Sequence, residues 1–340
     1  MLPERDEVGK LGAVWLKRLW ASHMTLPKRS SAERAEEWQA WHTVLSALEL
    51  AQEPTVKYLH TQRPSFEQFE DWILEFNGGV IDKARIERLN DVMMGREVSP
   101  QVREMQNAIE AMDPVLDADA LAHWDEHGWV LLKNAISAEA AEQTAQVVWQ
   151  AQGMDADDPN DWGRRGPLQQ CVFVQMFRHP VLDANRHSAR IHKAYAQLWG
   201  RTDLWATTDR IGFNAPVTPE FPFPGPGIHW DVSLVQPIPF GIQGLIYLTD
   251  TAADQGAFAL VPGMHRTIGP WLQSLPEGVD PRQYACEHLS MTPIAGQAGD
   301  MVLWHQALAH GPTPNRASVP RLVHYLTMFP ADFGFIPEWL

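Results

Sequence analysis

The sequence predicts an α+β protein in which an all-helical N-terminal region precedes a domain built mainly of antiparallel strands. Apolar residues recur at helical spacing up to about residue 113, whereas short extended segments with few intervening helices dominate the rest of the chain. The pair Asp113-Pro114 marks the change. We therefore expect a helical region over residues 1–113 and a second domain over residues 114–340.

Four or five helices are expected in the N-terminal region. Ser65 and Gln68 form a capping box at one start, Asn77-Gly78-Gly79 ends that helix, and Asp82 can cap the next. Aromatic stripes at helical spacing usually form a core, although a substrate or cofactor box is the alternative. The sequence leaves open whether this region covers an active site, recognises a substrate or forms a dimer. The apolar stripes of the expected helices cover residues 11–19, 38–48, 66–76 and 82–93.

The second domain begins with a short helix that Asp117 can cap and Gly128 can close, followed by a strand over Trp129 to Leu132. A long acidic, glycine-containing loop follows the next helix. Many strands with few helices indicate a sandwich or barrel of antiparallel sheet. Further helices are expected over 138–149 and 182–198, and strands near 171–176, 205–214, 228–235, 242–249, 257–261, 288–294, 300–305 and 321–329.

Composition excludes several classes of protein. The 27 basic and 42 acidic residues give a net charge of -15 without a basic stripe, so nucleic acid is not an expected partner. The charged start lacks the layout of a secretory signal, and no run of apolar residues is long enough to suggest a membrane partner. Only Cys171 and Cys286 are present, which fits a reducing compartment. The cytoplasm is the expected location.

The strongest chemical signal is a His-x-Asp motif at His229 and Asp231. On an extended segment these side chains share a face, so imidazole and carboxylate can hold one ion, with His310 as the candidate third ligand. Two histidines and one carboxylate leave metal positions open, which suits non-haem ferrous iron that activates dioxygen. Arg321, shortly after His310, can bind the far carboxylate of a 2-oxo acid bidentately.

Several separate segments, in order along the chain, resemble the phytanoyl-CoA dioxygenase family of iron and 2-oxoglutarate dependent oxygenases. The resemblance covers roughly the last two thirds of the chain. It implies a double-stranded β-helix (jelly roll) as the catalytic domain, with Fe²⁺, 2-oxoglutarate as co-substrate, and O₂. The segments that carry it are Asp125–Leu132, His229–Asp231, Gly256–Arg266, Gly299–His305 and His310–Arg321.

The resemblance also assigns roles to residues. His229, Asp231 and His310 are expected to be both the metal ligands and the catalytic centre. Members that halogenate have Gly or Ala at the carboxylate position, so Asp231 favours hydroxylation. Arg321 is expected to bind the co-substrate, together with Tyr247 and Gln243, which share a strand face.

The sequence leaves two points open. His305 and Arg316 have the same spacing as His310 and Arg321, but Arg316 falls in a turn-forming segment whereas Arg321 opens an alternating strand. We therefore prefer the second pair. Some relatives place a serine two residues after the distal histidine, where this chain has Pro312. The co-substrate contact that such a serine makes must then come from another group, for which Thr313 and Tyr247 are candidates.

The sequence thus predicts an Fe(II)/2-oxoglutarate-dependent dioxygenase that hydroxylates an unactivated carbon of a small organic molecule, with release of succinate and carbon dioxide. One alternative is the same oxidative chemistry with desaturation, epimerisation or cyclisation as its outcome. Another is a jelly-roll protein that binds a metal or small ligand without turnover. The identity of the substrate and the oligomeric state do not follow from the sequence.

Overall fold

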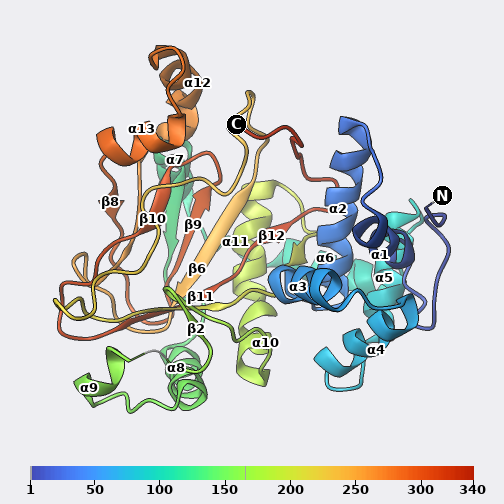
Figure 1. The fold of residues 1–340 in the computed structure, drawn as a ribbon, viewed down its shortest axis with the longest axis horizontal. Coiled ribbons are helices and arrows are strands. Elements are labelled where there is room, and N and C mark those ends of the chain that lie inside the picture. Colours follow the sequence, from blue (N-terminus) through green and yellow to red (C-terminus); the bar gives the residue numbers. More distant parts are fainter. Residues whose placement is uncertain (1, 165) are drawn as a thin grey trace.

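A computed structural model describes residues 2–164 and 166–340 of the chain. It shows an α+β protein whose paired strands are antiparallel, with helices gathered at the N-terminal end (Figure 1). The helices are α1 (Leu16–Thr25), α2 (Ser31–Ala47), α3 (Gln52–Gln62), α4 (Phe66–Phe76), α5 (Lys83–Met93), α6 (Pro100–Ala111), α7 (Ala118–His127), α8 (Ala138–Gln152), α9 (Pro159–Trp162), α10 (Pro180–Arg186), α11 (Ala189–Trp199), α12 (Met264–Ser274) and α13 (Pro281–His288).

The strands form one large and two small sheets within the described chain. The large sheet has the order β1-β9-β6-β11-β5-β3-β2, and the smaller sheets are β10-β7-β8 and β12-β4. The strands are β1 (Trp129–Leu132), β2 (Gln169–Gln170), β3 (Phe173–Val174), β4 (Trp205–Ala206), β5 (Ile211–Asn214), β6 (Ile242–Tyr247), β7 (Phe258–Leu260), β8 (Thr292–Pro293), β9 (Met301–His305), β10 (His310–Pro312), β11 (Arg321–Tyr325) and β12 (Met328–Phe329).

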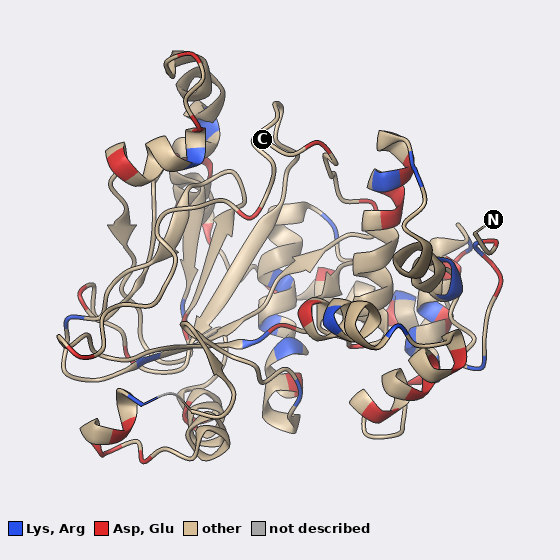
Figure 2. Ribbon diagram, viewed as in Figure 1, with Lys and Arg blue, Asp and Glu red and all other residues tan. Residues whose placement is uncertain are grey.

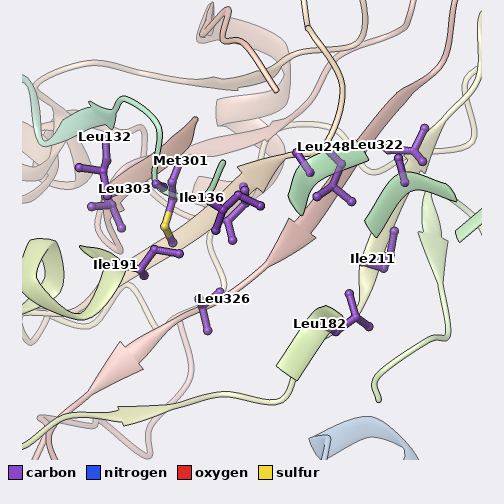
Figure 3. Packing of buried hydrophobic residues seen from close by; sticks show 14 of the residues in the cluster. Leu132, Ile136, Leu182, Ile191, Ile211, Leu248, Met301, Leu303, Leu322 and Leu326 are labelled. Atoms are coloured by element: carbon purple, nitrogen blue, oxygen red, sulfur yellow. The ribbon is translucent and has the colours of Figure 1, made fainter. Parts of the chain in front are cut away.

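The two faces of the large sheet bury different sets of side chains. One face packs with residues of α8, α10 and α11, and Figure 3 shows Leu303 and Leu322 of this face together with Ile191 and Leu182 from the helices. The opposite face carries Tyr247 and its neighbours, which pack with residues of the small sheet β10-β7-β8. Since strand side chains alternate between the two faces, both faces of the large sheet are covered by other parts of the protein.

The N-terminal helices share a second core that reaches the strands. Residues from α1 to α5 pack around Trp41 and Phe69, and the cluster includes Trp205 of β4 and Phe329 of β12. The capping box at Ser65 is confirmed, and Asp82 caps α5 as expected. Charged residues are frequent on these helices and on loops, whereas the central strands carry few (Figure 2). The aromatic stripes in this region are thus largely core, as expected.

Several expected boundaries differ from the structure. The first helix begins at Leu16 rather than near residue 11, because Trp15 adopts a left-handed conformation with φ of 67°. The helix expected over 182–198 is broken into α10 and α11, with Ser188 capping the second. Six helices, α1 to α6, precede residue 113 among the residues described, where four or five were expected.

The expected strand over 228–235 is wrong. Only His229 forms a β-bridge, and it pairs with His310 of β10. The expected strand over 288–294 is reduced to β8, and α12 and α13 occupy part of the long connection between β7 and β9. In the described ranges, no helix combines the length and the apolar character that a membrane crossing requires.

Candidate metal centre

Three side chains from distant parts of the chain converge at one point. His229, Asp231 and His310 each offer one ligand atom, and these atoms lie within 4.8 Å of one another. The Nε2 atom of His310 lies 3.2 Å from one carboxylate oxygen of Asp231, and the Nε2 atom of His229 lies 3.8 Å from the other. The structure therefore brings together the three ligands that the sequence predicted.

Backbone pairing fixes the two histidines side by side. The amide of His229 donates to the carbonyl of His310 at 2.9 Å, and the reverse bond measures 3.0 Å. Gly311 follows directly, and a Cβ atom there would lie 2.8 Å from the carbonyl oxygen of Gly227. This close approach explains why a glycine follows the distal histidine.

Second hydrogen bonds orient both rings. The Nδ1 atom of His229 lies 2.8 Å from the carbonyl oxygen of Gly227, and that of His310 lies 3.0 Å from the carbonyl oxygen of Leu308. A carbonyl oxygen can only accept, so each Nδ1 carries the proton in a neutral ring. Each Nε2 is then left with a lone pair directed toward Asp231, which is the arrangement that metal-binding imidazoles adopt.

Asp231 is held by a chain of side-chain hydrogen bonds. The side-chain amide nitrogen of Gln243 donates to the carboxylate of Asp231 at 2.7 Å, and the indole of Trp304 donates to the side-chain oxygen of Gln243 at 3.0 Å. Burial alone would raise the pKa of Asp231. When the two imidazoles are protonated, the hydrogen bond and charge of His310, the charge of His229 and the Gln243 amide outweigh burial and lower the pKa of Asp231. The carboxylate is therefore ionised at neutral pH and available to a cation.

Arg321 is almost completely buried, with 1% of its surface exposed. It lies on β11 opposite Asn214 of β5. Its Nε and Nη2 atoms have no hydrogen-bond partner, and neither has the side-chain oxygen of Asn214. Nε and Nη2 form one edge of the guanidinium, which matches the two oxygens of a carboxylate. A buried unpaired cation is costly, so this position fits the binding of an anionic group.

The other residues predicted to bind the co-substrate lie nearby. Tyr247 of β6 lies opposite Val323 of β11, which shares a strand face with Arg321 and Tyr325. Burial raises the pKa of Tyr247 and of Tyr325, and the charge of Arg321 opposes both shifts. The hydroxyl of Tyr247 donates to the carbonyl of Ile294 at 2.5 Å. Thr313 donates to the carbonyl of Ala257 at 2.9 Å. Each hydroxyl hydrogen is already in use, so each oxygen is left free only to accept.

The alternative pair does not join the cluster. The ring of His305 packs against the rings of His265 and Phe240, and its Nδ1 accepts a hydrogen bond from the backbone amide of Ala307. Burial lowers its pKa to about 4. Arg316 is exposed, in a loop after β10. The geometry thus favours His310 and Arg321 over His305 and Arg316.

A large cavity of about 1150 Å³ opens at the three ligands. It is lined by His229, Asp231 and His310, and by Gln243 and Trp304. Arg321 is not among the described residues that line it, although Tyr325, on the same face of β11, is.

Sequence reasoning missed two further groups at this site. Asn214 ends the expected strand over 205–214, but nothing in its surroundings marked it as a partner of Arg321. The helices α2 and α3 and the segment 333–339 also contribute to the cavity wall. The sequence does not distinguish aromatic residues that line a cavity from those that pack in a core, because both kinds of position are apolar.

Two imidazoles and a carboxylate beside an open cavity, in an antiparallel-sheet protein, define the class of site used by non-haem iron oxygenases. The family model described as phytanoyl-CoA dioxygenase (PhyH) matches residues 98–323, which is more than half of the chain. The chain therefore belongs to the phytanoyl-CoA dioxygenase family. This confirms the resemblance drawn from the sequence, and with it the expected cofactors Fe²⁺, 2-oxoglutarate and O₂.

Individual relatives are distant. A putative phytanoyl-CoA dioxygenase of Dictyostelium discoideum is 20% identical over 267 residues, covering 62% of this chain and 74% of the relative. Among solved structures, HygX from Streptomyces hygroscopicus with nickel and 2-oxoglutarate bound has a TM-score of 0.48 and 16% identity, covering 64% of this chain and 88% of HygX. The carbocyclase SnoK from nogalamycin biosynthesis has a TM-score of 0.46 and 19% identity, covering 68% of this chain and 88% of SnoK.

Proposed function

We propose that this oxygenase hydroxylates an unactivated carbon of a small or medium-sized organic molecule, while 2-oxoglutarate is converted to succinate and carbon dioxide. The observation that carries the proposal is the pairing of two features. Three candidate ligand atoms lie within 4.8 Å of one another. The edge of the Arg321 guanidinium that has no hydrogen-bond partner is buried in the same strand-rich region, residues 114–340.

The donor set fits ferrous iron. His229 and His310 would bind through Nε2, because each Nδ1 is committed to a carbonyl, and Asp231 would bind through its carboxylate. Three protein ligands leave positions for a chelating 2-oxo acid and for dioxygen. Iron bound there would activate dioxygen, which is the oxidant of the reaction. Retention of Asp231 as a ligand supports hydroxylation over halogenation.

The remaining residues position the reactants. Arg321 would hold the far carboxylate of 2-oxoglutarate through Nε and Nη2. Gln243 holds the Asp231 carboxylate in place through a bond of 2.7 Å. The substrate would lie in the cavity beside the ligands, where apolar walls exclude water from the reacting carbon. No side chain is required to act as a general base.

We also propose that the sheets form a double-stranded β-helix, with residues 114–340 as the catalytic domain and residues 1–113 as the helical N-terminal region. The large sheet and the sheet β10-β7-β8 enclose one apolar cluster, which supports a jelly roll. Contacts such as the bond from Lys193 to the carbonyl of Glu110 join the two regions closely.

The proposal is tested by succinate formation. Purified protein with ferrous iron, 2-oxoglutarate and air should produce succinate slowly without substrate and faster with a true substrate. Asp231→Ala should abolish this, whereas Asp254→Ala, at an exposed position, should not. A protein that binds metal but never forms succinate would instead be a non-catalytic binder. The mass of the product separates hydroxylation from desaturation, epimerisation or cyclisation.

A further inference from the structure

The cavity reaches well beyond the metal ligands. On the side formed by the N-terminal region it is lined by Trp38 and His42 of α2 and by Val56 of α3. The segment 333–339 lines it as well. The same hollow that contains the three ligands is therefore closed in part by helices outside the large sheet, which gives these helices a direct contact with whatever fills it.

The segment 333–339 is fixed on both of its sides. Toward α2, the ring of Phe335 stacks on Trp38 with centroids 4.7 Å apart, and Gln39 donates to the carbonyl of Phe333. Toward the ligand segment, the amide of Leu340 donates to the hydroxyl of Ser233 at 3.2 Å. This wall is thus a built part of the protein, ordered by contacts to both regions.

The wall offers aromatic surface. His42 lies edge-on to the rings of Phe329 and Phe333, and burial lowers its pKa to about 4, so that it is uncharged at neutral pH. Its Nε2 atom has no hydrogen-bond partner. Trp199 and Phe240, which also line the cavity, meet edge to face with ring centroids 4.8 Å apart. Aromatic rings of this kind suit an apolar ligand, and their edges can contact the face of a planar ligand.

The charges of the cavity do not suit a polyanion. Among the residues that line it, Arg210 forms an ion pair with Glu53 and lies beside Asp209. Lys57, at an exposed position, is the other cationic side chain of the described lining. A coenzyme A thioester carries several phosphate charges, which proteins hold with clusters of Arg and Lys or with helix N-termini. One unpaired lysine does not provide such a cluster.

We propose that the substrate is an uncharged, largely apolar molecule that binds against the wall formed by α2, α3 and the segment 333–339, and that acyl-coenzyme A thioesters are not substrates. That this molecule is a substrate depends on the proposed oxygenase function, whereas the binding site for an apolar molecule does not. The helical N-terminal region is then a determinant of specificity.

The test uses N-phenyl-1-naphthylamine, an uncharged aromatic dye whose fluorescence rises in apolar surroundings, with the full chain loaded with Ni²⁺ and 2-oxoglutarate. We expect saturable binding of one dye per chain. Val56→Trp, which fills the cavity from α3, should weaken binding by about tenfold or more. Thr61→Trp, the same change at an exposed position of the same helix, should alter it by less than about twofold. Equal effects of the two variants, or no saturable binding, would overturn the proposal.

Two further comparisons complete the experiment. Phe335→Ala removes the ring stacked on Trp38 and should also weaken dye binding, which covers the case in which Val56→Trp fails to fold as judged by circular dichroism. Dodecanol should displace the dye, whereas dodecanoyl-coenzyme A should not. Displacement by the thioester at least as strong as by the alcohol would show that the site accepts the polyanion, against the proposal.

Failure of the proposed function would look different. Asp231→Ala should lose succinate formation, because Asp231 is a proposed metal ligand, and this loss tests the oxygenase function separately from dye binding to the wild-type protein. Normal dye binding in a wild-type protein that forms no succinate would contradict the oxygenase function and leave the ligand class intact. Succinate formation without saturable dye binding would support the oxygenase function and contradict the proposed ligand class.

Discussion

Replacement of Arg321 by leucine should separate co-substrate binding from metal binding. The side chain is 1% exposed, and its unpaired Nε and Nη2 atoms form one edge of the guanidinium. A carboxylate on that edge accepts two charge-assisted hydrogen bonds, each worth roughly 1.5–3 kcal/mol. Loss of both corresponds to about two to four powers of ten in the dissociation constant of 2-oxoglutarate.

Isothermal titration calorimetry on Ni²⁺-loaded protein measures this constant without turnover. Arg321→Leu should weaken 2-oxoglutarate binding to the extent given above while Ni²⁺ binding changes little. It should also leave the unfolding free energy of the unliganded protein unchanged or raise it, because a buried unpaired cation is removed. Arg316→Leu is the matched control, since Arg316 is exposed and has the same spacing from the competing histidine His305.

Two results would refute this reasoning. One is an Arg321→Leu variant that binds 2-oxoglutarate as tightly as the wild type. The other is an Arg316→Leu variant with the large loss, which would restore the alternative pair that the geometry disfavours.

Three further changes have defined outcomes. Gly311→Ala places a methyl group 2.8 Å from a backbone carbonyl and should weaken metal binding by about tenfold or more in a competition assay with a chelating dye, whereas Gly163→Ala, which has nothing within 4 Å, should not. Gln243→Leu removes the 2.7 Å bond to Asp231 and should lower metal affinity by about 10- to 100-fold in the same assay; unchanged affinity would contradict the bond's positioning role. Burial and a nearby arginine hold the pKa of His324 well below 6.5, so the unfolded chain takes up the proton first and stability falls as the pH drops below 6.5. His324→Leu should reduce that slope by up to about 1.4 kcal/mol per pH unit in denaturant titrations, and an unchanged slope would count against the buried neutral ring.

Local signals in the sequence predicted the three candidate ligand residues that converge in the structure, and many element boundaries. The caps at Ser65, Asp82 and Asp117 lie where hydrogen-bonding side chains meet free backbone amides, and such contacts are made within a few residues. The segment after His229 was expected to be a strand because its side chains must share a face. The structure achieves the same convergence with a single bridge to His310. The convergence of side chains can thus be predicted correctly even where the predicted secondary structure is wrong.

Features that depend on tertiary contacts could not be predicted. Asn214 faces Arg321 only because β5 and β11 pair in one register. Trp38 has the same helical spacing as core residues, and it becomes part of the cavity wall only because Phe335, almost three hundred residues later, stacks on it. Helical periodicity identifies the buried face of α2, but it cannot distinguish residues that pack in a core from residues that line a cavity.

The most direct test of the account is a crystal structure of the protein with Fe²⁺ and 2-oxoglutarate, grown without oxygen and phased on the anomalous signal of iron. We expect one ion about 2.0–2.3 Å from Nε2 of His229, Nε2 of His310 and a carboxylate oxygen of Asp231. The far carboxylate of 2-oxoglutarate should meet Nε and Nη2 of Arg321. An ion bound at His305, or a co-substrate whose carboxylate lies away from Arg321, would contradict the account.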